Sequence, residues 1–307
     1  MKKIVMLMEK EFIDEYLKIP DIKHGKIYHY TSAEGLRGIL NGELWITDSE
    51  FLNDKMEFKL GNEVFYEIIR KHISDKNALK RIYRAFKKEM AIPMGKSNYA
   101  FDDRCFVLSC STACDSMLMW SEYSGFIGYC MEFNIADFRK QFDERFTFRG
   151  KVVYKREEQI GILTDYIENV MFSDDFDERC AGSWDELAKC DDSTLDFFIT
   201  NVGVACFLCN MFFKNECFEQ EQEYRFVIYG VGKRIKNTSE IITDFRVKNE
   251  TIIPFIRMPI TNDLGLKRVI VGPINHSDIS VKGVKALCGF KNISAKVVNS
   301  EVPIRYS

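Results

Sequence analysis

The sequence predicts one α+β domain over residues 1–307, built around a mainly antiparallel β-sheet that carries helical insertions. Three observations favour this class. Strand-like and helix-like segments alternate irregularly, no G-x-G-x-x-G turn follows a strand, and no Gly-, Pro- or Ser-rich linker divides the chain. Parallel α/β folds are built from regular βαβ units, so this irregular order favours a mixed sheet.

The composition is typical of a soluble globular protein, with 46% hydrophobic and 29% charged residues. The formal net charge is −3, so any contact with nucleic acid requires a local basic patch. The opening residues resemble a signal peptide only briefly, because Glu9, Glu11 and Asp14 end the apolar part. No apolar run approaches the length of a membrane span, so we expect a cytoplasmic protein without a membrane partner.

Ten cysteines are scattered along the chain, mostly beside apolar residues, as reduced core cysteines usually are. Cys206 and Cys209 form a C-x-x-C pattern inside an apolar, helix-like run, with no second pair and no nearby histidine. A buried helix face explains this pattern better than a zinc or redox site. We therefore assign no metal.

The first elements are an N-terminal helix over about 1–20 and a strand–helix–strand unit over 26–47. The first strand of this unit ends in a His-Tyr-Thr-Ser sequence, and Ser32 is placed to accept an N–H from the first turn of the helix. The helix carries its apolar residues on one face at helical spacing: Leu36, Ile39 and Leu40.

Two helices follow, over about 56–73 and 76–91, and they form the first helical insertion. The second is strongly basic. Such a helix face is either solvated or a docking surface for an acidic partner, and the solvated face is the more common case. The basic residues are Lys80, Arg81, Arg84, Lys87 and Lys88.

The remaining chain alternates between strands and helices. A second helical insertion is predicted over 157–215, and it contains a long apolar helix from about Leu195 to Phe213. Alternation of apolar and polar residues predicts the strands. They lie at about 105–110, 128–133, 146–149, 152–154, 224–229, 252–256, 268–271 and 295–298, with helices over 115–123 and 277–287.

Three segments carry polar or aromatic residues that packing alone does not require. They are His29–Ser32, Trp120–Tyr123 and Glu221–Arg225. In the last of these, strand periodicity places the ionisable residues on one face, where burial is costly unless they are paired or used. Each segment has a structural explanation as well, such as a histidine bonded to a carbonyl, core aromatics, or a surface ion pair.

These motifs together resemble the bacterial family called domain of unknown function 2971. The resemblance spans about residues 26–306, and the chain departs from the usual pattern at Lys55, where members carry proline. The family name implies no activity. The matching motifs are Tyr28–Ser32, Asn53-Asp54, Met119–Tyr123 with Gly128 and Glu132-Phe133, Glu221–Arg225, Val271–Pro273 and Ser300–Arg305.

More distantly, the strand–His–x–Thr–helix–strand opening is similar to the ADP-ribosyltransferase fold, in the branch that uses His, Tyr and Glu in chain order. This resemblance implies a split sheet and NAD as substrate. His29 would bind the adenosine-side ribose, Tyr123 would stack on nicotinamide, and Glu223 would stabilise the oxocarbenium ion that develops on the nicotinamide ribose. Further NAD-binding candidates are Tyr30, Thr31, Ser32, Trp120, Glu221 and Arg225.

The physical demands of NAD cleavage suit these residue types. Breaking the N-glycosidic bond builds positive charge on the ribose, and a carboxylate aimed at that charge stabilises the transition state. Several alternatives stay open. Glu221 competes with Glu223, Arg225 is either a phosphate ligand or the partner of Glu223, and the aromatic or polar role of Tyr123 has four alternatives: Tyr30, Tyr129, Ser109 and Ser111.

Three functions are compatible with the sequence. The first is an NAD-consuming ADP-ribosyltransferase or NAD glycohydrolase, a toxin or phage-defence effector with a protein or nucleic-acid acceptor. It requires a cleft that holds His29, an aromatic residue and Glu223 together. The second is a non-catalytic nucleotide-binding module of the same fold. The third is an RNA-processing enzyme that uses His29, Arg225 and the basic residues of 80–88.

Overall fold

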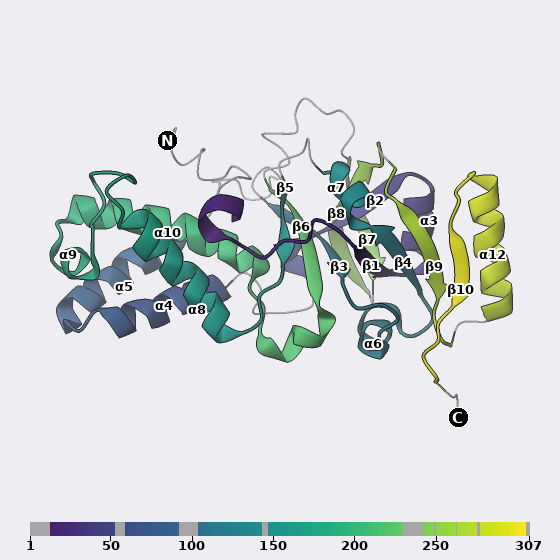
Figure 1. The fold of residues 1–307 in the computed structure, drawn as a ribbon, viewed down its shortest axis with the longest axis horizontal. Helices are drawn as coiled ribbons and strands as arrows, with labels where there is room; N and C mark the ends of the chain where they lie inside the picture. The colour runs from purple at the N-terminus through teal and green to yellow at the C-terminus, as the bar shows by residue number, and fades with distance from the viewer. Residues whose placement is uncertain are drawn as a thin grey trace. The chain divides into compact units, whose positions relative to one another are not determined.

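The computed structural model describes residues 13–52, 59–91, 104–142, 147–229, 242–248, 250–261, 263–274 and 277–304. The chain divides into two compact units (Figure 1). The helical unit comprises Met1–Pro20, Asp54–Tyr99 and Val152–Phe218, and the sheet unit comprises Asp21–Asn53, Ala100–Lys151 and Glu219–Ser307. The helical unit thus consists of the N-terminal segment and the two predicted insertions.

The helical unit is organised around α10 (Asp192–Phe212), which contacts α4, α5 and α8. Of the predicted N-terminal helix, the described part is a short π-helical turn over Ile13–Leu17; residues 1–12 lie outside the described residues. The other helices of this unit are α4 (Leu60–His72), α5 (Lys76–Met90), α8 (Arg156–Tyr166) continuing into the π-helical Ile167–Met171, and α9 (Trp184–Lys189).

Close packing of α4 on α10 requires a glycine at position 61. A Cβ at Gly61 would lie 2.6 Å from the carbonyl oxygen of Cys206, and the Gly61 N–H donates to Asn210 Oδ1 at 2.7 Å. Cys206 and Cys209 are both buried on α10, which confirms the predicted buried helix face.

Within the described residues, α10 is the one helix long and apolar enough to cross a membrane by length and composition. The sequence-based expectation that no apolar run approaches this length is therefore corrected for Asp192–Phe212. Of the most apolar 18-residue stretch of α10, 78% is buried inside the structure, as is typical of a core helix.

The sheet unit contains a ten-stranded sheet in the order β10-β9-β4-β1-β3-β2-β8-β7, with β6 beside β3 and β5 beside β6. All described pairs are antiparallel except β9–β10, so the predicted mixed, mainly antiparallel sheet is confirmed. The strands are β1 (Lys26–Thr31), β2 (Glu43–Asp48), β3 (Cys105–Ser111), β4 (Tyr129–Asn134), β5 (Thr147–Lys151), β6 (Glu223–Tyr229), β7 (Ile242–Lys248), β8 (Thr251–Pro259), β9 (Leu266–Val271) and β10 (Lys296–Asn299).

The sheet divides along one edge of β3. The opposite edge of β3 pairs with β6 over its whole length. On the dividing edge, β1 pairs with β3 at Ser111, whereas β2 pairs with it at Phe106 and Val107. The strands β1 and β2 therefore share β3 as a neighbour and diverge from each other. We call the interval beside residues 108–110, between these two sets of pairs, the sheet split.

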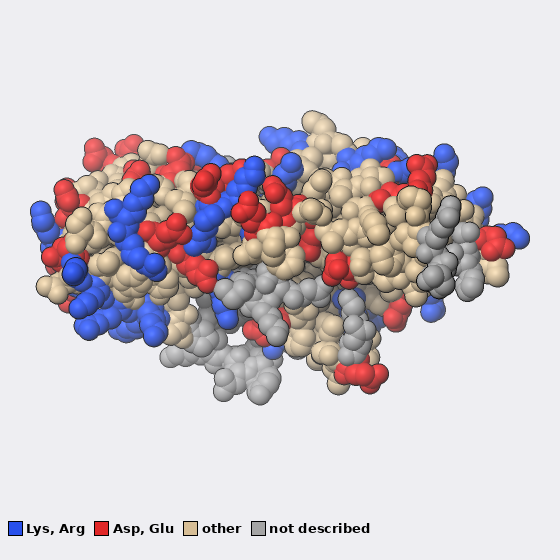
Figure 2. Space-filling model, turned by 90° about the horizontal axis from the view of Figure 1, so that it is seen from below, with Lys and Arg blue, Asp and Glu red and all other residues tan. Residues whose placement is uncertain are grey.

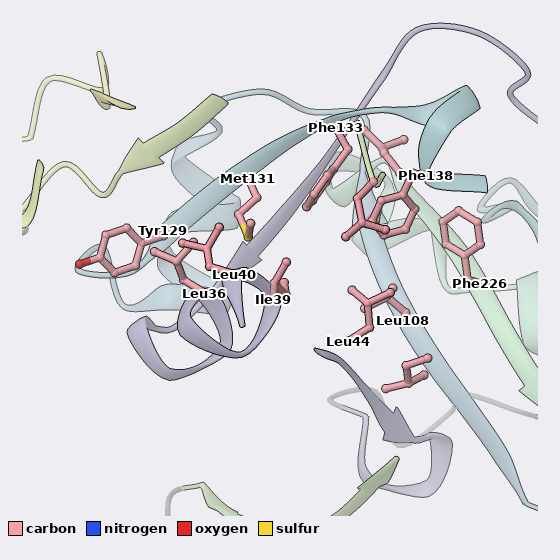
Figure 3. Packing of buried hydrophobic residues seen from close by; sticks show 14 of the residues in the cluster. Leu36, Ile39, Leu40, Leu44, Leu108, Tyr129, Met131, Phe133, Phe138 and Phe226 are labelled. Carbon is pink, nitrogen blue, oxygen red and sulfur yellow. The ribbon is translucent and has the colours of Figure 1, made fainter. Parts of the chain in front are cut away.

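Helices cover both faces of this sheet. The larger core lies under α3 (Ala33–Leu40), α7 (Ile135–Lys140) and α12 (Ser277–Phe290). Figure 3 shows Leu36, Ile39 and Leu40 of α3 directed toward Tyr129 and Met131 of β4. On the other face, α6 (Met117–Ser124) contributes Met119 and Trp120 to a smaller cluster with Tyr28, Tyr30 and Ile270.

The predicted strand–helix–strand unit is confirmed as β1, α3 and β2. Ser32 is the N-cap of α3, and its hydroxyl oxygen accepts from the Gly35 N–H at 3.2 Å. Gly35 also permits the close approach of β1, because a Cβ there would lie 2.1 Å from Thr31 Oγ1. The helix after His29 is thus fixed to the strand that carries this histidine.

Candidate functional site

His29 lies on β1 at the sheet split and is partly exposed. Its Nδ1 is 2.9 Å from the carbonyl oxygen of Ser109 on β3, where the two backbones do not pair. A carbonyl oxygen only accepts hydrogen bonds, so Nδ1 carries the proton and donates. In the neutral imidazole this leaves the lone pair on Nε2, which makes Nε2 a hydrogen-bond acceptor.

The surroundings of His29 favour this neutral form. Burial is the main cause that lowers its pKa, and the positive charge of Arg246 lowers the pKa further, against the opposing effect of the Ser109 carbonyl. The imidazole therefore accepts at Nε2 at neutral pH, as a ligand for a hydroxyl group requires.

Arg246 comes from β7, a strand that the sequence analysis missed. Its Nη2 donates to Thr47 Oγ1 at 2.7 Å, and its guanidinium carbon lies 5.6 Å from the centroid of the Phe255 ring. Its Nε is buried and has no hydrogen-bond partner among the described residues. The negative charge of Glu34, in the first turn of α3, also acts on this guanidinium. We call His29, Thr47 and Arg246 the histidine cluster.

The depressed pKa of His29 predicts a specific pH dependence of stability. Below the ordinary histidine pKa of about 6.5 the unfolded chain takes up a proton that folded His29 resists, so the free energy of unfolding falls as pH falls. The free energy of unfolding changes by at most about 1.4 kcal/mol per pH unit for this one group. The change stops below the pKa of His29 in the folded protein, where both states bind the proton.

Urea unfolding of the wild type and of His29→Asn between about pH 7 and pH 5 measures this effect. Asparagine keeps a donor for the Ser109 carbonyl but does not titrate. The variant should lose the part of the slope that His29 contributes. Equal slopes for the wild type and His29→Asn would contradict the prediction.

A second group of predicted residues meets on the other side of β3. Arg225 is fully buried and binds Glu223 through two bonds, from Nε to Oε1 and from Nη2 to Oε2, both 2.9 Å long. Tyr123, on α6, hydrogen-bonds the carboxylate of Glu221. Burial and the charges of Glu221 and Glu223 raise the pKa of Tyr123. We call Tyr123, Glu221, Glu223 and Arg225 the carboxylate cluster.

Glu221 reaches this cluster by a route that differs from the prediction. It does not lie on the strand face of Glu223, because β6 begins at Glu223 and Glu221 ends a 3₁₀ helix over Glu216–Glu221. The residue between them, Gln222, has a positive φ of 46° and separates the 3₁₀ helix from β6. The Ser111 hydroxyl donates to the carbonyl oxygen of Glu221 at 2.6 Å and holds this turn against β3.

The structure does not bring His29 and Glu223 together as the first hypothesis requires. Ser111 pairs with Tyr28 on β1 and with Glu223 on β6, so Tyr28 and Glu223 share one side of the sheet. His29 follows Tyr28 directly and faces the other side. The histidine cluster and the carboxylate cluster thus lie on opposite flanks of β3.

Two predicted NAD-binding aromatics have packing roles in this structure. Trp120 is fully buried, its indole N–H donates to Asp115 Oδ1 at 2.7 Å, and its ring meets that of Tyr30 edge-on at 5.0 Å. Tyr30 is 7% exposed, donates its hydroxyl to the Ala113 carbonyl and accepts from the Ser116 N–H. Neither ring presents an open face to a ligand.

The remaining predicted residues lie around the histidine cluster or outside the described part. Thr31 and Ser32 follow His29 closely in the chain; Thr31 is partly exposed and Ser32 is exposed. Of the two roles proposed for Arg225, the structure shows the ion pair with Glu223. Asn53-Asp54 and Lys55 lie outside the described residues. The described part of the chain contains no group of three or more His, Cys, Asp or Glu side chains suited to a metal ion.

The missed residue Arg246 had a sequence signal. In Ile242–Lys248, polar and apolar residues alternate as Asp244, Phe245, Arg246 and Val247, which is the period of a half-buried strand. Arg246 lies beside Thr47 of β2 because this strand pairs with β8, which in turn pairs with β2. The local alternation of residues does not predict such a long-range pairing.

No curated protein and no solved structure matches the chain. A family model does match, over residues 119–226, and this range includes the whole carboxylate cluster but not His29 or Arg246. Over residues 119–226 the chain is therefore similar to the family described as "Protein of unknown function (DUF2971)".

Proposed function

We propose that the sheet unit is a nucleotide-binding module of ADP-ribosyltransferase-like fold. Its ligand is NAD, which binds at the histidine cluster. This proposal depends on one observation: a hydrogen-bond acceptor, Nε2 of His29, and a cation, the guanidinium of Arg246, belong to the same cluster. Nε2 of His29 is held in acceptor form by the Nδ1 bond to Ser109, within range of the charge of Arg246. A ribose offers hydroxyl donors and a pyrophosphate offers anionic acceptors, which match these two groups.

The fold supports this proposal in two ways. The sheet is mainly antiparallel and divides beside β3, as a split-sheet fold of this type requires. The start of α3 follows His29 at once, and the N–H groups and dipole at a helix N-terminus favour anionic groups. Arg246 supplies a full positive charge to the same neighbourhood, with an Nε that has no partner among the described residues.

Calorimetric titration of the purified chain with NAD, ADP-ribose and nicotinamide tests this function. NAD and ADP-ribose should bind, and nicotinamide alone should not, because the histidine cluster recognises ribose and phosphate. At about one hundred times its Kd, NAD should raise the free energy of unfolding by about 2.7 kcal/mol. Binding of nicotinamide alone, or no binding of either nucleotide, would rule the assignment out.

NAD cleavage at the carboxylate cluster is the second candidate function. It requires that NAD binds at this cluster and not at the histidine cluster, because the two lie on opposite flanks of β3. The cluster sets the carboxylates of Glu221 and Glu223 beside the partly exposed ring of Tyr123, and a carboxylate is the group that stabilises an oxocarbenium ion. The reaction would transfer ADP-ribose to a protein, a nucleic acid or water, as in a toxin or phage-defence effector.

The same titration samples separate binding from cleavage. Nicotinamide release from NAD, measured with and without cell lysate, should fall in Glu223→Gln and Glu221→Gln if this cluster cleaves the bond. Bound NAD that stays intact under all these conditions supports the binding module without catalysis. Circular dichroism of both variants shows whether the sheet unit is still folded.

A further inference from the structure

The exposed face of α5 (Lys76–Met90) is almost entirely basic. Six residues of this helix are exposed; five are basic and the sixth is Asn77. This concentration is unusual in a chain whose net charge is −3. Figure 2 shows blue Lys and Arg side chains gathered at the left, over the helical unit. We call the five basic residues the basic face: Lys76, Lys80, Arg84, Lys87 and Lys88.

The spacing of these residues points to a linear, negatively charged partner. Lys76, Lys80, Arg84 and Lys88 follow at intervals of four residues, one helical turn apart, so their charges repel along the helix. Within the described residues no member of the basic face forms a salt bridge, whereas Arg81, at the edge of this face, approaches Asp192 at 4.0 Å. A row of basic side chains that repel one another is stabilised by a ligand whose negative charges repeat along its length.

An aromatic platform adjoins this row. Tyr83 lies three residues after Lys80 and four before Lys87, and it is partly exposed. Its ring stacks on that of Tyr66 from α4, with centroids 4.7 Å apart and an interplanar angle of 17°. The guanidinium of Arg70 lies 5.8 Å from the centroid of the Tyr83 ring. Bases of a single strand stack on such rings while basic side chains follow its phosphates.

We propose that the basic face and Tyr83 form a docking surface for a single-stranded polynucleotide. The charge pattern matches a phosphate backbone, and the aromatic pair favours unpaired bases over an acidic protein or an anionic lipid surface. This inference goes beyond the proposed function and does not depend on it, because every residue involved belongs to the helical unit.

Fluorescence anisotropy with a labelled oligouridylate of about 15 nucleotides, a length within the site sizes of single-strand binders, tests the surface. If about four phosphates are neutralised, affinity should fall about 50-fold between about 50 and 200 mM salt. The triple variant K80E/R84E/K87E should lose most of the affinity and flatten this salt dependence. The matched control K282E/K285E/K291E makes the same charge change on and just after α12 and should bind like the wild type.

The aromatic contribution has its own pair of variants. Tyr83→Leu should weaken binding roughly ten-fold with an unchanged salt slope, and Tyr83→Phe, which keeps the ring, should bind like the wild type.

Equal losses of affinity in the two triple variants, or binding to phosphatidylserine vesicles or polyglutamate in place of the oligonucleotide, would overturn the proposal. If K80E/R84E/K87E fails to fold by circular dichroism, the decision rests on the wild-type salt slope, and a flat slope overturns the proposal. Intact NAD binding in K80E/R84E/K87E keeps this outcome separate from that of the proposed function.

Discussion

Replacing Arg225 by methionine should cost about 3–5 kcal/mol of the free energy of unfolding, the largest effect of any single substitution proposed for this chain. Arg225 is fully buried, and both oxygens of Glu223 accept from it. Without the guanidinium, Glu223 stays 5% exposed beside Glu221 with its charge no longer compensated by Arg225. Urea unfolding measured at neutral pH gives the difference directly.

The double variant R225M/E223L separates the ion pair from the packing volume. Since a buried pair is often no more stabilising than well-packed apolar residues, the double variant should be more stable than R225M alone. If both variants are equally destabilised, the lost stability comes from the change in side-chain shape and not from the loss of the Arg225 charge beside Glu223. If R225M is as stable as the wild type, the buried pair described here does not form.

Arg246→Met should weaken NAD binding about 10- to 150-fold, which corresponds to the 1.5–3 kcal/mol of a hydrogen bond to a charged group. The substitution removes the positive charge that lowers the pKa of His29, while methionine retains contact with the Phe255 ring. Calorimetric titration with NAD measures the change.

The control for this loss is Lys285→Met, which removes one positive charge from an exposed position of α12 in the same unit. It should leave NAD binding unchanged. An equal loss in Lys285→Met and Arg246→Met would indicate a general charge effect, and an unaffected Arg246→Met would exclude this guanidinium from the site.

Local patterns predicted those parts of the fold that depend on neighbours in sequence. The apolar spacing of Leu36, Ile39 and Leu40 and the capping chemistry of Ser32 predicted α3, and both are confirmed. The alternation in residues 105–110 predicted β3 in the same way. These signals are strong because helix and strand periods are set by backbone geometry within a few residues.

The arrangement of the candidate site depends on register, which local patterns do not contain. His29 and Glu223 were both predicted at strand positions, but the one-residue offset between His29 and Tyr28 decides which side of the sheet the imidazole faces. Likewise, a turn with positive φ at Gln222 takes Glu221 out of the strand. Arg246 enters the site because β7 pairs with β8, which pairs with β2.

The central claim is that Nε2 of His29 is an acceptor that binds a nucleotide. The most direct test is a nitrogen-15 spectrum of the four histidines, with His29 assigned from the His29→Asn variant, recorded with and without NAD. We expect free His29 as the neutral tautomer protonated at Nδ1, and a shift of its Nε2 signal toward that of a hydrogen-bonded nitrogen when NAD is added. An unchanged His29 signal at NAD concentrations that saturate binding would contradict the claim.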